Sequence, residues 1–557
     1  MKSTISDHEE ALLDEAATAG TLRKTAIYTR LSGPGWLQGA LTLGGGSLAG
    51  ALYLGILFGP HMLWLQPLAM ICGVVMLSAI TYVTLSTGER PFMLIMKRVS
   101  PFLAWAWLIA TVIANLVFCL PQFSLATAAL QQNISPDIAG GLSPYVIGAV
   151  IFIVCAVIVG FYNRGGMGVK LFESILKIMV GLILLSFLGV AAIVLSQGVF
   201  DFSTILKGHL PSLSYFNNPT PAFQEAIAQT GANQEAWTGI VTGDHAGIMI
   251  AAFGTAVGIN MTFLLPYSMM KRNWGKRHRG MAIFDLALGL IIPFFIATAC
   301  LVISSASQFH GKTADVFDED GELRPAMEGS FNAAISPLIA QLQASGRAAT
   351  PEEAAALITP EDREVAAMLA RRDVAQLASS LEPFTGEFLA QKIFGLGVLG
   401  MAVSSIIMLM LINGFATTEA FGRPGDRRLH FIGAMMPGVI GFFNPVIWTG
   451  ASRAALAIPA ATIAGALIPI AYFTFLLLMN SRSALGEELP KAGRRIYWNT
   501  IMVIATSLVS FGAIWVTVKK TASPGLEGVM ATIMLIAMAA LFVLGIYGFL
   551  RNNRIAS

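Results

Sequence analysis

The chain has 557 residues, of which 55% are apolar and only 12% are charged, and its formal net charge is +3. Soluble domains carry about a quarter charged residues, so this composition excludes an ordinary soluble protein and indicates a surface that faces lipid. We therefore expect the lipid bilayer as the surroundings of the chain and no nucleic-acid partner.

The first 31 residues lack an apolar core and carry acidic residues such as Glu9 and Asp14. They are predicted to form a polar cytoplasmic tail and not a cleaved signal peptide. The four cysteines lie inside hydrophobic stretches without C-x-x-C spacing, which indicates buried thiols and neither disulfides nor a thiolate metal site.

Apolar stretches of about 20 residues, the length that crosses a bilayer as a helix, recur along the chain. We predict twelve spans, seven before residue 305 and five after residue 392, so that both termini share one side. They cover residues 34–58, 63–86, 102–130, 144–161, 171–195, 247–270, 281–305, 393–421, 432–449, 454–479, 496–518 and 529–550.

Basic residues alternate between the two sides of the predicted bundle. The side with both termini, including residues 551–557, carries 23 of the 35 Lys and Arg. By the positive-inside rule this side is cytoplasmic, and we expect a multi-pass protein of the cell membrane.

One long polar interruption covers residues 306–391 and is expected on the extracellular side. Its 309–387 stretch carries fourteen Asp and Glu against six Lys and Arg. Residues 351–381 have a helical pattern that begins at Thr350, a helix-start signal. The acidic run near Asp318 lacks the spacing of a calcium loop, so we interpret the insertion as a small solvated cap.

Two predicted spans, the first and the sixth, contain residues that interrupt helices. Gly44, Gly45 and Gly46 are consecutive in the first, and each glycine costs about 1 kcal/mol against alanine in a helix. In the sixth, Gly258 and Asn260 precede Leu265-Pro266-Tyr267, and a proline removes a helical hydrogen bond. Breaks at matching positions five spans apart predict an inverted five-plus-five repeat with a midplane binding site.

The motifs around these breaks resemble the NRAMP (natural resistance-associated macrophage protein) divalent-metal transporters. Gly33-Pro34-Gly35 with the later glycines is similar to that family's GPG opening and DPGN element. The stretch from Gly168 to Glu173, the start of span seven around Asp285, and Ser336-Pro337-Leu338 are similar as well. The resemblance runs from about residue 33 to 486 and implies the LeuT-type fold with two additional C-terminal helices.

The residues that the resemblance assigns to metal binding differ from the family pattern. The family's Asp, Asn and Met ligands fall on Gly44, Ser47 and Leu265, and its carbonyl ligand falls on Thr262. Neither the carboxylate that compensates a dication nor the soft sulfur that selects transition metals remains. The sequence therefore identifies no metal ligand.

Polar groups remain around the predicted breaks. The candidate substrate-binding residues are Thr42, Gly44, Gly45, Gly46, Ser47, Asn260, Thr262 and Leu265. The glycine amides at a half-helix end suit an anion or carboxylate, whereas hydroxyls and carbonyls suit a weakly bound or hydrated cation. The sequence leaves both open.

Ionisable groups inside predicted spans are functional candidates by default. Glu173 and Lys177, at i and i+4, can pair as a gate latch or as a structural ion pair. Asp285 matches a family acid and is a candidate for coupling or for a helix-end charge. Tyr267 stands where the family has a histidine, so we add it to the gating or coupling candidates.

The leading hypothesis is an NRAMP-like alternating-access secondary transporter, for which the resemblance implies a divalent metal cation. The alternatives are a carrier of a small organic solute, such as a zwitterion or carboxylate, and a non-transporting membrane sensor. No HExxH or GxSxG pattern indicates an enzyme, and we expect no cofactor. The oligomeric state and the driving ion are not indicated.

Overall fold

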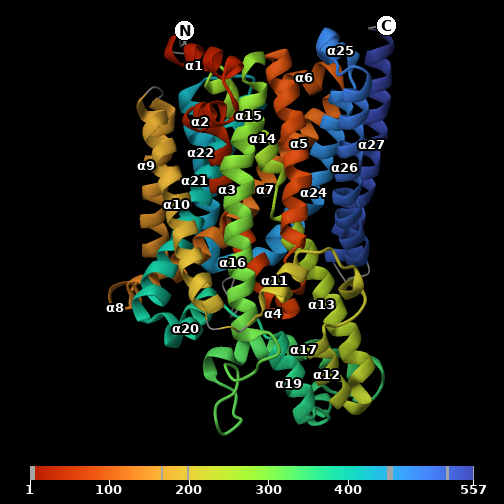
Figure 1. The fold of residues 1–557 in the computed structure, drawn as a ribbon. Coiled ribbons are helices and arrows are strands. Elements are labelled where there is room, and N and C mark those ends of the chain that lie inside the picture. The colour runs from red at the N-terminus through yellow and green to blue at the C-terminus, as the bar shows by residue number, and fades with distance from the viewer. Residues whose placement is uncertain are drawn as a thin grey trace.

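The computed structural model describes residues 7–164, 167–196, 198, 200–447, 456–521 and 526–555. Within these ranges the chain is helical without strands, apart from one isolated β-bridge between Phe317 and Leu323. The predicted all-α membrane fold is confirmed. Both ends of the chain lie at one end of the helix bundle, the termini end, and the insertion lies at the opposite end, the insertion end (Figure 1).

Ten helical segments of the described chain are long and apolar enough to cross a bilayer, and a bent pair adds an eleventh. The bent pair consists of α3 (Pro34–Thr42) and α4 (Gly45–Phe58). The others are α5 (Leu65–Thr87), α7 (Pro101–Ala128), α9 (Pro144–Arg164), α10 (Met167–Ser196), α13 (Gln234–Gly254) with α14 (Ile259–Lys271), α15 (Arg279–Leu286) with α16 (Ile292–Phe309), α21 (Phe394–Ala420), α24 (Ala457–Met479), α26 (Ala492–Thr521) and α27 (Leu526–Ile555).

The predicted ninth span differs from its expectation. Residues 432–449 correspond to α22 (Arg427–Phe442) and the short α23 (Asn444–Ile447), and residues 448–455 lie outside the described ranges. A helix of 16 residues is about 24 Å long, which is shorter than the ~30 Å bilayer core. Eleven of the twelve predicted spans therefore coincide with segments that pass the length and hydropathy criteria for crossing a bilayer.

Both predicted helix breaks are present. The pair α3 and α4 bends by 51° at Leu43 and Gly44. The sixth span is divided into α13 and α14 by residues 255–258, where Gly258 has an extended backbone. Glycine stabilises a helix less than other residues and adopts non-helical backbone angles easily. A run of glycines is therefore where leaving the helical conformation costs the least free energy.

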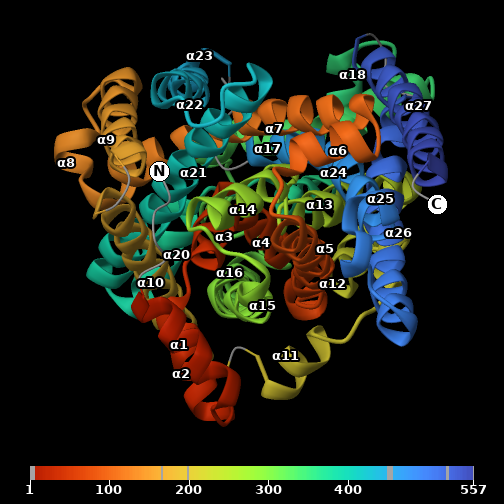
Figure 2. The same ribbon diagram turned by 90° about the horizontal axis from the view of Figure 1, so that it is seen from above.

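The halves α3, α4 and α14 occupy the centre of the bundle, and α9, α26 and α27 lie at its rim (Figure 2). Glycines allow the central elements to approach closely. A Cβ on Gly39 would lie 2.1 Å from the carbonyl oxygen of Gly289, and a Cβ on Gly35 would lie 2.1 Å from that of Asp285. Any side chain at these positions would separate α3 from the segment at residues 285–289.

Shorter helices lie outside the spans. They are α1 (Asp7–Thr18), α2 (Thr21–Leu31), α6 (Pro91–Arg98), α8 (Pro136–Ala139), α11 (Phe202–Gly208), α12 (Pro221–Gln229), α17 (Glu328–Ala344), α18 (Pro351–Ala356), α19 (Pro360–Leu369), α20 (Val374–Thr385) and α25 (Arg482–Leu485). The predicted helical stretch 351–381 is thus divided into α18, α19 and α20. Thr350 does cap α18, because its Oγ1 accepts from the amide of Glu353 at 3.2 Å.

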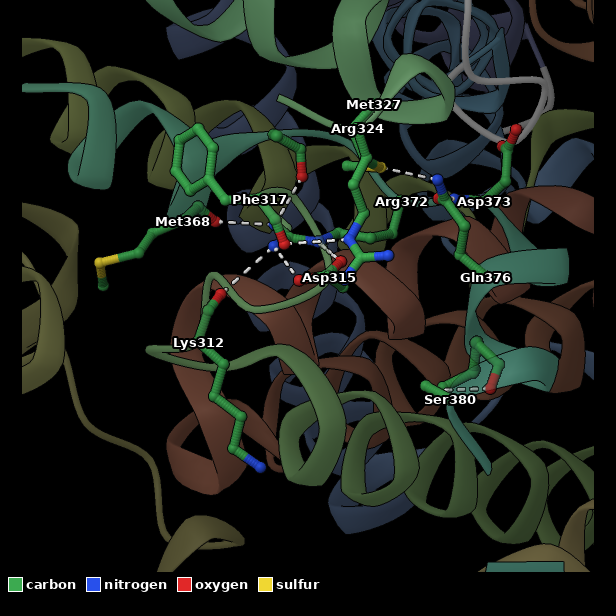
Figure 3. A network of polar contacts seen from close by, with 12 residues as sticks. Lys312, Asp315, Phe317, Arg324, Met327, Met368, Arg372, Asp373, Gln376 and Ser380 are labelled. Carbon is green, nitrogen blue, oxygen red and sulfur yellow. Dashed lines mark hydrogen bonds and ion pairs between the residues drawn. The ribbon is translucent and has the colours of Figure 1, made fainter. Parts of the chain in front are cut away.

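The insertion is held together by a buried arginine. Arg372 has no exposed side-chain surface, and its guanidinium donates to both carboxylate oxygens of Asp315 at 2.9 and 3.0 Å (Figure 3). The same group donates to the carbonyl of Ala370 at 2.8 Å. A buried cation is tolerated only when it is paired and hydrogen-bonded, as it is here.

The insertion also contacts two half-helices at the insertion end. The hydroxyl of Tyr53, on α4, donates to the carbonyl of Arg372 at 3.2 Å. Arg371 lies over the ring of Tyr53, 4.9 Å from its centroid, and forms an ion pair with Asp244 on α13. The insertion therefore links α4 to α13.

Candidate functional site

A small cavity lies where the two helix breaks meet in the centre of the bundle. The cavity has a volume of about 30 Å³, which is room for one or two waters or a single ion. Its lining comes from α3, α4, α7, α14, α21 and the two breaks. The lining residues are Leu41, Thr42, Gly44, Gly46, Ser47, Phe118, Gln122, Thr255, Gly258, Asn260, Met261, Ser405 and Leu409.

We call this space the polar cavity. Each hydroxyl group in its lining donates its proton to a backbone carbonyl. Thr42 Oγ1 donates to the carbonyl of Ala256 at 2.6 Å. The single proton of Ser47 Oγ is directed to the carbonyl of Thr42 at 2.5 Å, with the carbonyl of Thr255 3.3 Å from the same oxygen. The other two donate likewise, Thr255 Oγ1 to Ala252 at 2.9 Å and Ser405 Oγ to Leu41 at 3.2 Å. Because the one proton of each hydroxyl is already donated to a backbone carbonyl, the hydroxyl oxygen can only accept further hydrogen bonds or coordinate a cation.

The first break also has an amide that is already bound. Gly45 donates its N–H to Oε1 of Gln122 on α7 at 2.8 Å. The glycine amides were a candidate anion site, and this one is occupied by a side chain of the protein. The hydroxyls of the cavity lining thus offer lone pairs, which suit a cation or the protons of water. The side-chain N–H groups of Gln122 and Asn260, whose oxygens already accept from the backbone, are the donors that remain in the lining.

The sequence matches the family model described as natural resistance-associated macrophage protein-like over residues 35–352 and 352–519. The chain belongs to the Nramp family. A search of curated protein sequences finds no match to this Nramp chain.

Solved structures of similar fold agree with this assignment. A single-residue variant of the manganese transporter of Eremococcus coleocola has a TM-score of 0.63 at 15% identity, with 99% of this chain and 97% of that chain covered. The same transporter in complex with an aromatic bis-isothiourea substituted compound has a TM-score of 0.53 at 15% identity, with 98% and 97% covered. At this identity the likeness establishes the fold, and it extends over both chains.

The structure brings together most of the predicted binding residues of this Nramp chain. Thr42, Gly44, Gly46, Ser47 and Asn260 all line the polar cavity, and Gly45 lies behind it against Gln122. None of the lining residues carries a carboxylate, an imidazole or a thiol. Over the described residues, no group of three or more His, Cys, Asp or Glu could hold a metal ion.

Two predicted binding residues lie away from the polar cavity. Thr262 accepts from the indole N–H of Trp107 at 2.9 Å, and Leu265 is packed in the core with 1% exposure. The reason is that the second break lies at residues 255–258, while Pro266 is inside α14. The residues at the break are therefore Thr255 and Gly258. Gly258 was named as an interrupting residue in the sequence analysis but was not counted among the binding residues.

Gln122, Thr255, Ser405 and Met261 were also missed by the sequence analysis. On α7 a signal existed, because Thr111, Asn115 and Gln122 are spaced to lie on one face of an otherwise apolar helix. Within this span only ionisable groups were considered as candidates, and these three side chains are neutral.

The gating candidates gather at the termini end, around the start of α3. Asp285 on α15 accepts from the amides of Gly33 and Gly35 at 3.0 and 2.6 Å. Lys177 on α10 donates to the carbonyl of Ser32 at 3.1 Å. Together these contacts hold the first residues of α3 between two helices.

The predicted pair of Glu173 with Lys177 is not formed. Glu173 instead forms a two-pronged ion pair with Arg272, which follows α14, and Arg272 also donates to the carbonyl of Leu31 at 3.1 Å. An arginine fork matches a carboxylate better than a lysine ammonium does, and α14 carries it to the carboxylate of Glu173. The ion pair therefore joins α10 to α14.

Tyr267 lies farther inside, among aromatic rings. It stacks on Phe263 with centroids 4.7 Å apart and on Phe415 with centroids 5.6 Å apart. These contacts join α14 to α21 between the polar cavity and the termini end.

Proposed function

We propose that this Nramp-family protein is an alternating-access secondary transporter of a divalent metal cation, and that the cation occupies the polar cavity. Family membership supports the transport mechanism. The observation that carries the substrate class is the orientation of the hydroxyls of Thr42, Ser47, Thr255 and Ser405, which all donate to carbonyls and present lone pairs.

The cation is expected to keep part of its water shell. Neutral oxygen ligands do not compensate a dication, and Mg²⁺ in particular gives up its waters reluctantly. Waters bound to the ion would donate to the hydroxyl lone pairs of Thr42 and Ser47. The thioether of Met261 is the only sulfur in the lining, so preference for soft transition metals should be weak.

An organic solute receives no comparable support. The polar cavity has room for one or two waters, and the amide of Gly45, a natural partner for a carboxylate, is bound to Gln122. A non-transporting sensor is not supported by any feature of the insertion, whose charged residues Arg372 and Asp315 pair internally.

Access is proposed to alternate between the two ends. The termini end is closed by polar contacts that hold α3 and α14 in place, made by Asp285, by Lys177 and by the pair of Glu173 with Arg272. Between these contacts and the polar cavity, the ring of Tyr267 closes the path. At the insertion end, Arg371 and Arg372 hold α4 against α13. We further propose that the termini end is cytoplasmic, because the positive-inside rule places the richer basic side there.

Gly44→Asp tests the site directly, because it places a carboxylate in the polar cavity. Purified protein and the variant are compared by thermal shift with Mg²⁺ and Mn²⁺, and flux is measured in proteoliposomes. We expect weak stabilisation of the wild type by both ions. The aspartate variant should bind Mn²⁺ roughly tenfold tighter than the alanine variant of the same position, since the carboxylate adds charge compensation while both variants carry the same crowded Cβ.

Gly44→Ala is the steric control. Its Cβ would lie 2.3 Å from Oγ of Ser405, as in the aspartate variant, but it adds no charge. A wild type that already binds Mn²⁺ tightly, or an aspartate variant that binds no better than the alanine variant, would refute the proposed site. Flux of an organic solute without flux of any divalent ion would refute the substrate class.

A further inference from the structure

A second and much larger cavity lies at the side of the bundle, between α5, α13, α24 and α26. Its volume is about 690 Å³, and nearly all of its lining is apolar. Examples are Leu68 on α5, Phe253 on α13 and Val516 on α26. We call it the apolar cavity.

The apolar cavity runs from the insertion end toward the middle of the membrane. Its outer end is bounded by Trp64, by Asn217 and by Trp515 of α26, near the ends of the spans. Its inner end reaches Phe253 and Gly254, the last residues of α13 before the second break. The cavity therefore follows the direction that a lipid chain takes in one leaflet.

The wall of the apolar cavity is not sealed on the rim side of the bundle. Leu213 and Phe511, which both line it, are 73% and 67% exposed. The helix α26 lies at the edge of the bundle (Figure 2), where a membrane-spanning protein is surrounded by lipid. Lipid is therefore the apolar molecule that reaches this cavity from its surroundings.

Polar groups are concentrated at the outer end of the apolar cavity. Lys519 lies one turn beyond the lining residue Trp515, with its Nζ 4.3 Å from the centroid of the indole ring. Asn217 lines the same end, and the buried indole N–H of Trp64 has no hydrogen-bond partner in the described chain. A cation, an amide and two indoles at the membrane boundary match a phospholipid headgroup and its ester carbonyls.

We propose that the apolar cavity binds a bilayer phospholipid, with an acyl chain between α13 and α26 and its phosphate beside Lys519. A water-soluble ligand of this size would need several polar groups inside the cavity, whereas the inner part is lined by hydrocarbon except for the hydroxyl of Thr462. An acyl chain fills such a space without leaving any polar group unpaired. The site is separate from the polar cavity and goes beyond the transport proposal.

The bound chain would lie against Met249, Phe253 and Gly254 on α13. These residues precede the break at residues 255–258, so the lipid would support the half-helix at the point where it has no helical continuation. Lipid occupancy thereby contacts one of the two half-helices that the insertion links.

The test uses the full-length protein in vesicles of phosphatidylcholine that contain a photoactivatable diazirine on one acyl chain. After illumination, labelled peptides are mapped by mass spectrometry. We expect labels concentrated in residues 249–254, 462–468 and 508–516, above the level on other lipid-facing helices.

Gly512→Trp fills the cavity, because a Cβ at Gly512 meets nothing within 4 Å, and should lower this labelling roughly tenfold. Gly181→Trp, at an equally open position on α10, is the control and should leave it unchanged. Lys519→Gln, a surface change that spares folding, should weaken labelling roughly fivefold, and Lys520→Gln should not.

Labelling spread evenly over lipid-facing helices, or unchanged by both Gly512→Trp and Lys519→Gln, would overturn the proposal. Stronger labelling of the cavity by a photoactivatable free fatty acid, independent of Lys519, would overturn the phospholipid assignment. None of these readouts uses transport, so the outcome is distinguishable from failure of the proposed function.

Discussion

The two broken helices reach the polar cavity in different ways. At the first break the chain turns aside within Leu43 and Gly44, and side chains from α7 and α21 occupy the freed backbone groups. At the second break four residues, 255–258, separate the halves, and the hydroxyls of Thr42 and Ser47 bind the freed carbonyls. The first break is thus supported by its surroundings, and the second is supported largely by the first.

This difference indicates which residues tolerate change. Side chains packed around Gly44 and Gly45 leave no space, since a Cβ there would lie 2.3 Å from Ser405 Oγ or from Leu125 Cδ1. A Cβ on Gly258 would meet the amide end of Asn260 at 2.5 Å, and that side chain can rotate. The first break should therefore be the more sensitive of the two.

The largest effect is expected from Gly44→Leu, which overfills the polar cavity. Divalent-cation uptake in proteoliposomes should fall about a hundredfold, while Gly258→Leu should lower it roughly tenfold, because overpacking costs about 1–3 kcal/mol according to how far neighbours can move. Gly239→Leu, at an exposed position where a Cβ meets nothing within 4 Å, is the control for the added side chain. A larger loss in Gly258→Leu than in Gly44→Leu would reverse the comparison.

Gln122→Leu should come next, because it leaves the buried amide of Gly45 without an acceptor. An unpaired buried amide costs roughly 1–3 kcal/mol, so we expect a lower free energy of unfolding and about tenfold slower uptake. Asn115→Leu, on the same helix, should not destabilise the protein, since neither amide atom of Asn115 has a partner in the described chain. Equal stability of the two variants would show that the first break does not depend on Gln122.

A smaller effect is expected from Asp285→Asn, which loosens α3, the half of the first broken helix at the termini end. An asparagine can accept from only one of the two amides of Gly33 and Gly35, so α3 should leave its closed position more often. A cysteine introduced by Ala40→Cys should then react roughly fivefold faster with a thiol reagent, because a hydrogen bond to a charged group contributes about 1.5–3 kcal/mol. Asp285→Glu should restore slow labelling, and unchanged rates would place the gate elsewhere.

The smallest effect is expected from Pro266→Ala. Pro266 lies inside α14, so alanine restores a helical amide without moving the break, and uptake should change by less than about twofold. Thermal unfolding in detergent should show equal or higher stability. Loss of uptake comparable to that of Gly258→Leu would place the second break at the proline after all.

The sequence was sufficient for eleven of the twelve predicted spans and for the first break. Long apolar runs predict the helices that cross the membrane. Three consecutive glycines, Gly44 to Gly46, are costly in a continuous helix and so predict a break. The position of the second break could not be read from composition, because Gly258 and Pro266 are both helix breakers. Only packing decides that the proline stays inside α14, where the helix interior accommodates it.

The candidate site was predictable in part for the same reason. Residues on the two breaks, such as Thr42 and Asn260, were identified because the breaks were. Gln122 and Ser405 are distant in sequence and enter the polar cavity only through tertiary packing of α7 and α21. The partner of Glu173 was misassigned because an i,i+4 lysine was available locally, while Arg272 arrives from another helix.

The buried pair of Arg372 with Asp315 has a consequence for how the protein is made. The two residues enclose residues 316–371, about two thirds of the insertion, and Arg372 has no exposed side-chain surface. With the termini end on the cytoplasmic side, as proposed above, the insertion at the opposite end must be translocated across the bilayer before this pair can close. Docking of the insertion onto Tyr53 then fixes a helix that was synthesised some 300 residues earlier, as the Tyr53 bond to Arg372 spans a sequence separation of 319. In the proposed orientation, assembly of the membrane bundle is therefore completed on the extracellular side.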